Sequence, residues 1–373
     1  MNSIIPAPIA RQPWSMLTPL ILLTCFGAAV LYSAAGGSFS PFASSHLLRF
    51  GVFMVVALVI ASMPRDFVKL VAYPGYIAVL LLLVAVEAAG AMGGGSQRWL
   101  EVGPIRIQPS EIMKPTIALA LARFYDTLPT GMIGSWRALL PAGVIIVLPV
   151  ALVLMQPDLG TALAILFSGA VVMFLAGLPM SWFLTAGAAA AVAVPLAYNF
   201  ALKPYQQRRV TTFLDPESDP LGSGYHITQS KIAIGSGGFA GKGFNEGSQS
   251  HLQYLPEPHT DFVFATMAEE WGFLGGVFVI VCFGLILYWG LKVARTAQAR
   301  FDRLLAAGLV ATMFFYIAIN LLMVMGLAPV VGIPLPFMSH GGSSMMTNML
   351  CIGALMMIYR WNTQGRSGGL MST

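Results

Sequence analysis

The fold is decided by residues 137–177, RALLPAGVIIVLPVALVLM-QPDL-GTALAILFSGAVVMFLAG, which hold two long apolar runs separated by four residues. Arg137 and Asp158 are the only charged residues in this stretch. The hydrocarbon core of a bilayer is about 30 Å thick, and about 20 apolar residues of helix cross it. The stretch therefore predicts a pair of transmembrane helices joined by a short polar connection.

The remainder of the 373 residues repeats this pattern. Hydrophobic residues make up 57% of the chain and charged residues 9%, against roughly 25% charged residues in soluble domains, which excludes a water-soluble fold. Apolar runs predict spans at 16–35, 47–63, 70–92, 137–155, 160–177, 180–201, 262–290, 303–327 and 341–359. Residues 109–125 form a shorter helical stretch, expected to cross obliquely or to stop partway, buried against protein. We expect an all-α integral membrane protein, a single polytopic bundle of about ten transmembrane helices over residues 1–373.

The N-terminal segment and the three cysteines give little further information about function. Arg11 and the apolar run from Met16 to Leu31 have features of a signal peptide, but the runs that follow favour an uncleaved first span. Cys25, Cys282 and Cys351 all lie inside apolar runs, so they predict neither a disulfide framework nor a metal cluster.

Basic residues indicate the orientation in the membrane. If residues 109–125 cross, most of the net charge of +5 falls on one side, which the positive-inside rule makes cytoplasmic. These residues are Arg11, Arg65, Lys69, Arg123, Arg137, Lys292, Arg295, Arg300, Arg303, Arg360 and Arg366. Both termini are then cytoplasmic, and the long loop 203–261 is exoplasmic, where we expect it to contribute to a site.

That loop contains a glycine cluster, residues 235–243, which invites a nucleotide-binding interpretation. The spacing excludes a P-loop, because Ser236 stands where a glycine is needed and Gly243 where a hydroxyl is needed. No βαβ unit fits between the cluster and the span beginning near 262, which excludes a dinucleotide fold. We expect turns and close backbone approach instead.

Asp261 is the strongest candidate for a catalytic or metal-binding residue. It follows Thr260, a plausible helix cap, and precedes the apolar run that begins at Phe262. A first-turn acid can simply complement the helix dipole, or a carboxylate there can accept a proton from a hydroxyl or hold a divalent cation beside a phosphate. Glu269 is predicted near the same helix face, with Glu270 pointing away.

Other ionisable residues fall within or beside the spans. Glu111 and Lys114 are spaced to pair, and intramembrane charges are by default functional candidates, although a structural brace is the alternative. Asp158 is expected in a turn. Arg49, at the start of a span, can reach headgroups or a cavity.

Two further segments carry polar groups. In the long loop, Arg208 and Arg209 suit a diphosphate or lipid headgroups, and Ser223 is expected to cap a helix that passes through Gln229. Residues 326–344 are apolar but rich in Pro and Gly, so they must pack on protein or line a polar cavity. Within them, His340 is expected to be a hydrogen-bonded structural histidine rather than a base.

Several of these strings together resemble the bacterial SEDS (shape, elongation, division and sporulation) family. They are Gln97-Arg98-Trp99-Leu100, Gln108-Pro109-Ser110-Glu111 with Lys114, Gln156-Pro157-Asp158-Leu159-Gly160-Thr161, Leu214-Asp215-Pro216, Gly224-Tyr225-His226, Ala233-Ile234-Gly235-Ser236-Gly237-Gly238, His259-Thr260-Asp261-Phe262 and Glu269-Glu270-Trp271-Gly272. The string Gly332-Ile333-Pro334-Leu335-Pro336 is more similar to the rod-elongation branch than to the division branch. His340 departs from a tyrosine common at that place.

The resemblance implies a peptidoglycan glycosyltransferase of the bacterial inner membrane that polymerises lipid II on an undecaprenyl-diphosphate-linked glycan during elongation. It implies a class B penicillin-binding protein and other elongation-complex membrane proteins as partners, and no nucleic acid. It also implies that Asp261 is the essential carboxylate, with Glu111, Lys114 and Asp158 lining the same cavity.

From these points we predict Asp261, Glu111 and Lys114 as catalytic residues, and Asp261 as the ligand of a divalent cation, Mg²⁺ or Mn²⁺. The predicted substrate-binding residues are Asp158, Arg208, Arg209, Arg49, Gln229 and Ser339. Two alternatives remain open, a lipid II flippase or transporter and a non-catalytic scaffold for a transpeptidase.

Overall fold

The computed structural model describes residues 12–93, 96–102, 105–200, 207, 211, 222–252, 254–255 and 257–369, and these are mostly helical. The described helices are α2 (Trp14–Ala34), α3 (Phe42–Ala61), α4 (Arg65–Ala89), α5 (Pro109–Thr127), the 3₁₀ helix η1 (Thr130–Met132), α6 (Trp136–Met155), α7 (Leu159–Ala176), α8 (Met180–Phe200), α10 (Ser223–Ser236), α11 (Ser248–His251), α12 (Val263–Thr296), α13 (Arg300–Val324) and α14 (Gly342–Gly369). Nine of them are long and apolar enough to cross a bilayer. They correspond to the nine predicted spans, which confirms an all-α polytopic membrane protein.

The tenth predicted helix, α5, is present and lies inside the bundle. It packs against α4, α6, α7, α13 and α14, and it is about 28 Å long at 1.5 Å per residue. Small residues allow this close packing, since a Cβ placed on Gly308 of α13 would lie 2.7 Å from Cβ of Ala118. Glu111 and Lys114 at the start of α5 are therefore buried within protein.

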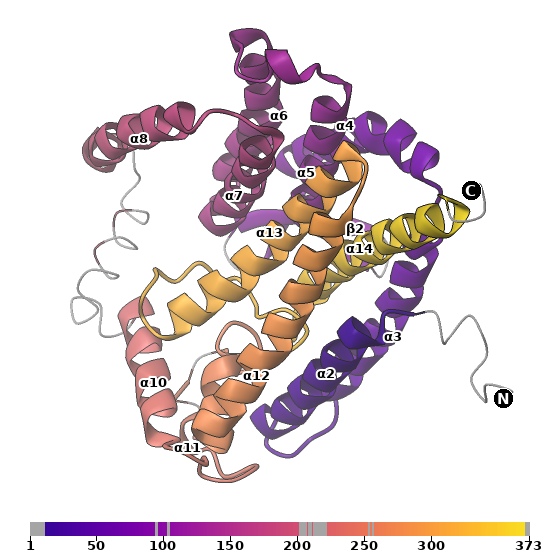
Figure 1. Ribbon diagram of the computed structural model, residues 1–373. Helices are drawn as coiled ribbons and strands as arrows, with labels where there is room; N and C mark the ends of the chain where they lie inside the picture. The colour runs from indigo at the N-terminus through magenta and orange to yellow at the C-terminus, as the bar shows by residue number, and fades with distance from the viewer. Residues whose placement is uncertain are drawn as a thin grey trace, which may run out of the picture.

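In Figure 1, α4, α6 and α7 lie near α5, whereas α2 lies away from it. Helix α14 packs against α3, and α2 packs against α3 and α12. Helix α8 stands apart from the bundle in Figure 1, and no residue of its most apolar window is buried. Its apolar surface is left for lipid or for another protein.

Helix α12 changes direction at Gly272, where φ is 59° and ψ is −152°. The break exposes backbone groups that the glycine-rich turn 237–243 satisfies. The amides of Lys242 and Gly243 donate to the carbonyls of Glu269 and Glu270, and the amide of Phe273 donates to the carbonyl of Gly238 at 2.9 Å. This arrangement confirms the expectation of turns and close backbone approach for the glycine cluster.

Three local expectations were wrong. The connection before α5 forms a small antiparallel sheet of β1 (Ala91–Gly93), β2 (Ser96–Val102) and β3 (Ile105–Ile107), which the expectation of an all-α chain did not include. Ser223 is the first residue of α10 and not its cap, which is Gly222. Helix α12 is capped at Phe262, so Thr260 and Asp261 lie in the turn before the helix.

Candidate active site

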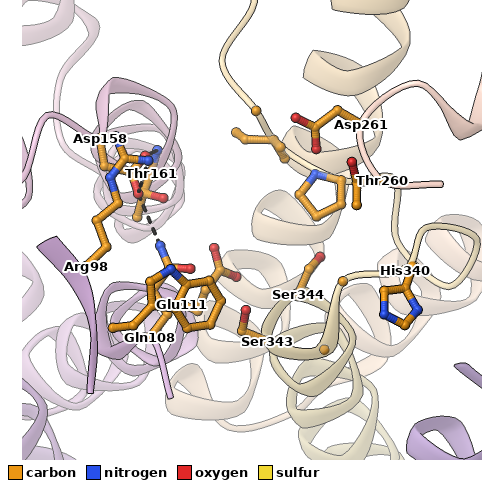
Figure 2. Close-up of a pocket in the computed structure, with 16 residues that line it drawn as sticks. Arg98, Gln108, Glu111, Asp158, Thr161, Thr260, Asp261, His340, Ser343 and Ser344 are labelled. Atoms are coloured by element: carbon orange, nitrogen blue, oxygen red, sulfur yellow. Dashed lines mark hydrogen bonds and ion pairs between the residues drawn. The ribbon is translucent and has the colours of Figure 1, made fainter. Parts of the chain in front are cut away.

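A cavity of about 290 Å³ opens between the starts of several helices. Figure 2 shows Arg98, Gln108, Glu111 and Asp158 on one wall and Asp261 and His340 on the other. The lining residues are Arg98, Trp99, Gln108, Glu111, Asp158, Thr161, Thr260, Asp261, Gly332, Ile333, Pro334, His340, Gly341, Gly342, Ser343 and Ser344. The cavity therefore combines groups of both charges with hydroxyls and exposed backbone.

The first wall is held by hydrogen bonds around Asp158. Its carboxylate caps α7 by accepting from the amide of Thr161 at 3.1 Å and also accepts from the side-chain amide of Gln108 at 3.2 Å. Arg98 donates to the carbonyls of Gln156 and Pro157, and its guanidinium lies 4.0 Å from Asp158. Asp158 is thus a turn residue that also lines the cavity.

Behind this wall lies a buried polar triad of Glu111, Lys114 and Tyr316. The ammonium of Lys114 donates to Glu111 at 2.6 Å and also to the hydroxyl of Tyr316. Tyr316 in turn donates to the second carboxylate oxygen of Glu111. Lys114 is completely buried and Glu111 lines the cavity, so the lysine acts on the cavity only through Glu111.

The opposite wall carries Asp261, fixed by its backbone. Its carbonyl accepts from the side-chain amide of Asn320 on α13 at 2.9 Å, and the same amide donates to Ile333 at 2.7 Å. Burial, and then the negative charge of Glu257, raise the pKa of Asp261 to about 6. A carboxyl with this pKa is largely ionised at neutral pH and is close enough to neutrality to accept a proton efficiently.

The segment before α14 passes close to Asp261. Gly332 has φ of 69°, a left-handed conformation, and a Cβ placed on it would lie 3.4 Å from the carboxylate oxygen of Asp261. Glycine here lets the backbone pass beside the carboxylate without crowding it. The Pro- and Gly-rich segment therefore lines a polar cavity, which is one of the two arrangements expected from its composition.

Next to this segment, His340 joins α3 to the cavity. Its Nε2 lies 3.3 Å from the guanidinium of Arg49, and its ring packs edge-on against Phe42. Burial, with the nearby charge of Arg49, lowers the pKa of His340 to about 4. The ring is therefore neutral at neutral pH, and its contacts with Arg49 and Phe42 hold it at the cavity.

Three helices begin at the cavity. Gln108 caps α5, Asp158 caps α7, and α14 starts at Gly342. Helix N-termini present unpaired amides and a partial positive charge, and they are common sites for phosphate binding. With Arg98 beside them, these helix starts offer positive potential next to the carboxylates of Glu111 and Asp158. Asp261 faces the same space from the other wall.

The predicted site residues are only partly brought together. Asp261, Glu111 and Asp158 line the cavity, whereas Lys114 lies behind Glu111. Three other predicted ligands do not line it. Arg49 contacts its rim through His340, Gln229 lies on α10, and Ser339 is buried in its own turn, accepting from the amide of Leu335. Arg208 and Arg209 lie outside the described residues.

Glu269 was misplaced by the helical-wheel argument, because Asp261 lies in the turn before α12 and the loop holds Glu269 within protein. Glu270 points away from the cavity, as expected. Glu269 accepts from Lys242 at 2.6 Å and from the amide of Gln249. Glu270 accepts from the hydroxyl of Ser33 on α2. Both carboxylates fasten the loop and α2 to α12, and neither lines the cavity.

Sequence reasoning singled out neither Tyr316 nor Asn320, and gave Arg98 no role. Tyr316 and Asn320 are separated by one helical turn in an otherwise apolar span. Polar side chains at this spacing share a helix face, and inside a membrane they need partners. This signal was present in the sequence.

The described residues contain no group of three His, Cys, Asp or Glu side chains that could hold a metal ion. Mg²⁺ is often bound by one or two carboxylates together with water and substrate phosphates. Asp261 can supply such a carboxylate, so the site fits a cation shared with a phosphate-bearing substrate and not one held by protein alone.

These features define a polytopic helical membrane protein with a charged cavity formed at the starts of several helices. The profile of the FtsW/RodA/SpoVE cell cycle proteins matches residues 13–364, and the chain belongs to this family.

Curated relatives share most of its length. The peptidoglycan glycosyltransferase MrdB of Escherichia coli K12 is 43% identical over 349 residues, which cover 92% of each chain. The peptidoglycan glycosyltransferase RodA of Treponema pallidum is 32% identical and covers 92% of this chain and 96% of the relative. Stage V sporulation protein E of Bacillus subtilis is 34% identical over 93% of this chain and 96% of its own.

Solved structures share the fold. One is a chain from a study of the structural coordination of polymerization and crosslinking by a peptidoglycan synthase complex. It has a TM-score of 0.84 and 32% identity, and the match covers 95% of this chain and 99% of that one. The rod shape determining protein RodA of Thermus thermophilus has a TM-score of 0.70 and 28% identity, covering 94% and 97%.

Proposed function

We propose that this chain, which is a peptidoglycan glycosyltransferase, polymerises lipid II into β-1,4-linked glycan strands, with Asp261 as the base that activates the acceptor. One observation carries the proposal. The carboxylate of Asp261 faces a cavity whose opposite wall offers Arg98 and two helix N-termini, those of α5 and α7 (Figure 2). This arrangement supports the proposal, because transfer from a diphosphate donor needs a base on one side and donors for the leaving group on the other.

In this mechanism the donor is the growing glycan on undecaprenyl diphosphate, and the acceptor is the 4-hydroxyl of the N-acetylglucosamine of lipid II. Asp261 takes the hydroxyl proton while the oxygen attacks the anomeric carbon. The bond from that carbon to the diphosphate breaks, and the electron pair leaves with the diphosphate from the opposite face. An α-linked donor then gives a β-linked product by inversion.

Charge grows on the leaving diphosphate, and the cavity can stabilise it. Arg98 offers donors whose planar geometry suits phosphate oxygens, and the N-termini of α5, α7 and α14 add partial positive charge. Such preorganised donors are worth most in a site shielded from water. Glu111 lines the same wall, with Lys114 and Tyr316 as positioning residues behind it.

A divalent cation, Mg²⁺ or Mn²⁺, is part of the proposal. Asp261 is the residue that would hold it, together with phosphate oxygens of the substrate. When bound, such a cation would neutralise charge on the diphosphate.

We further propose the cellular setting. The chain is a multi-pass membrane protein of a bacterial family, and the distribution of basic residues supports cytoplasmic termini and a cavity that opens to the exterior. Its relative in the peptidoglycan synthase complex supports a crosslinking partner, for which we propose a class B penicillin-binding protein. The similarity to MrdB and RodA supports a role in elongation with other membrane proteins of that process.

The test uses purified protein in vesicles with lipid II, with and without the partner. Two readouts are taken, glycan polymer and movement of lipid II across the membrane, for the wild type and for Asp261→Asn. We expect polymer from the wild type and a loss of about 10²–10⁴-fold in the variant. Transport without polymer would support the flippase, and equal polymer from both proteins would remove Asp261 from the mechanism. A scaffold would give no polymer and leave the partner's crosslinking unaffected by Asp261→Asn.

A further inference from the structure

A second cavity lies at the other end of α12 from Asp261. It has a volume of about 240 Å³ and is lined by residues from the start of α2, the end of α12 and the later turns of α14, among them Ser15, Trp289, Lys292, Thr296, Tyr359 and Asn362. Lys292 is 29 residues beyond the first residue of α12, or roughly 40 Å along the helix. The cavity is therefore separate from the candidate active site.

The charge that lines this cavity is positive. Lys292 is the only ionisable group among its lining residues apart from the phenol of Tyr359, and no acidic residue lines it. Lysine and tryptophan side chains can only donate hydrogen bonds. The lining therefore favours a ligand that is negatively charged and rich in acceptor atoms.

Asn362 provides an independent sign that something binds here. Its side chain lines the cavity and is only 8% exposed. Its amide nitrogen is buried and has no hydrogen-bond partner among the described residues. A buried donor without an acceptor costs about 1–3 kcal/mol, and a bound acceptor would remove that cost.

The position of the cavity limits the kinds of ligand that can reach it. All three contributing helices are membrane spans, and the lining residues lie at or near helix ends, where a span meets water. Trp289 and Tyr359 pack together with ring centroids 5.8 Å apart, and Trp and Tyr are typical of this boundary. Phosphate groups of phospholipids lie at the same depth.

We propose that this cavity is a binding site for a phosphate group, recognised by the ammonium of Lys292 and the side-chain amide of Asn362. Phosphate supplies the acceptor oxygens that both donors need. The group can belong to the headgroup of an anionic phospholipid or to free phosphate, and the aromatic pair at the membrane boundary favours the lipid. This site goes beyond the glycosyltransferase activity and does not depend on the mechanism proposed for Asp261.

The experiment measures binding to the purified full-length protein by native mass spectrometry. The probes are phosphatidylglycerol, a diacylglycerol with the same acyl chains, and inorganic phosphate. Two variants test the site. Lys292→Gln removes the charge at an exposed position, and Asn362→Leu removes the buried amide without changing net charge. Arg295→Gln is the matched control, because Arg295 is basic, exposed and in the last turn of the same helix but does not line the cavity.

We expect one tight phosphatidylglycerol site in the wild type, weakened about five- to tenfold by Lys292→Gln and by Asn362→Leu, and little changed by Arg295→Gln. Diacylglycerol should not compete. Displacement of phosphatidylglycerol by inorganic phosphate, sensitive to the same variants, would identify free phosphate as a ligand of the site, whereas resistance to it would identify the lipid.

Two results would overturn the proposal. One is wild-type affinity for phosphatidylglycerol and phosphate in Lys292→Gln. The other is an equal loss in Arg295→Gln, which would mean that the general charge of the surface governs binding. Because Lys292 is exposed, its variant is expected to fold, so the proposal stays testable if Asn362→Leu does not.

Discussion

The side-chain amide of Asn320 donates to the backbone carbonyl of Asp261 at 2.9 Å, and through the same nitrogen to the carbonyl of Ile333 at 2.7 Å. One buried side chain on α13 thus joins the turn that carries Asp261 to the Pro- and Gly-rich segment that lines the cavity beside it. The position of the proposed base depends on a helix that contributes nothing else to the lining.

Removing the two hydrogen bonds of Asn320 should lower enzymatic activity more than it lowers the amount of folded protein. Asn320→Leu keeps the size of the side chain but leaves two carbonyls without a donor, at about 1–3 kcal/mol for each buried group. We expect a drop of at least about tenfold in lipid II polymerisation, with a lower midpoint of thermal unfolding. The control is Asn199→Leu on exposed α8, where Asn199 donates only within its own helix. Equal rates in both variants would show that the link does not position Asp261.

The pH dependence of polymerisation should report Asp261. Because its pKa is raised to about 6 and the base must be ionised to accept a proton, the rate should fall as the pH drops through 6. Glu257 adds to the rise, so Glu257→Gln removes a negative charge, favours ionisation and shifts this acid limb to lower pH. Glu246→Gln, in the same loop, should leave the limb in place. An unchanged limb in Glu257→Gln would assign the titration to another group.

Arg98 should serve the substrate diphosphate. Arg98→Gln is expected to reduce polymerisation about 10- to 100-fold, since it removes a charged donor facing the leaving group. Arg106→Gln on strand β3 removes the same charge from an exposed residue outside the cavity lining. If both variants lose activity equally, the sheet as a whole matters and Arg98 has no particular contact with substrate.

The break in α12 should be intolerant of a side chain. At Gly272 an added Cβ would lie 2.4 Å from the amide nitrogen of Gly241, and φ is 59°. Gly272→Ala should therefore lower stability by at least about 2 kcal/mol. Gly284→Ala, where nothing lies within 4 Å, should be neutral or gain about 0.5–1 kcal/mol from the helix interior. Thermal unfolding in detergent compares them, and equal midpoints would contradict the strained break.

Much of the fold follows from apolar runs, because a membrane span must satisfy its backbone within one segment. That constraint is local, so each of the nine spans could be predicted alone. The break at Gly272 could not, since it is stabilised by hydrogen bonds from a turn some 30 residues earlier in the chain. For the same reason helical periodicity misplaced Glu269, which the turn holds through Lys242.

The site was predictable in part. Asp261, Glu111 and Asp158 stand out as charges at the ends of apolar runs, where each needs a partner or a function. In the sequence Lys114 cannot be distinguished from these residues. Its position behind Glu111 depends on a hydrogen bond to Tyr316, which lies 202 residues further along the chain. Partners brought together by packing of distant helices leave no local pattern.

The central claim is that Asp261 acts on the reaction and not on binding. The most direct measurement compares lipid II affinity with the single-turnover rate of glycosyl transfer in wild type and Asp261→Asn, at saturating substrate and neutral pH. We predict that affinity changes less than about threefold while the rate falls about 10²–10⁴-fold. A loss of affinity that accounts for the whole loss of rate would contradict the claim and make Asp261 a binding residue.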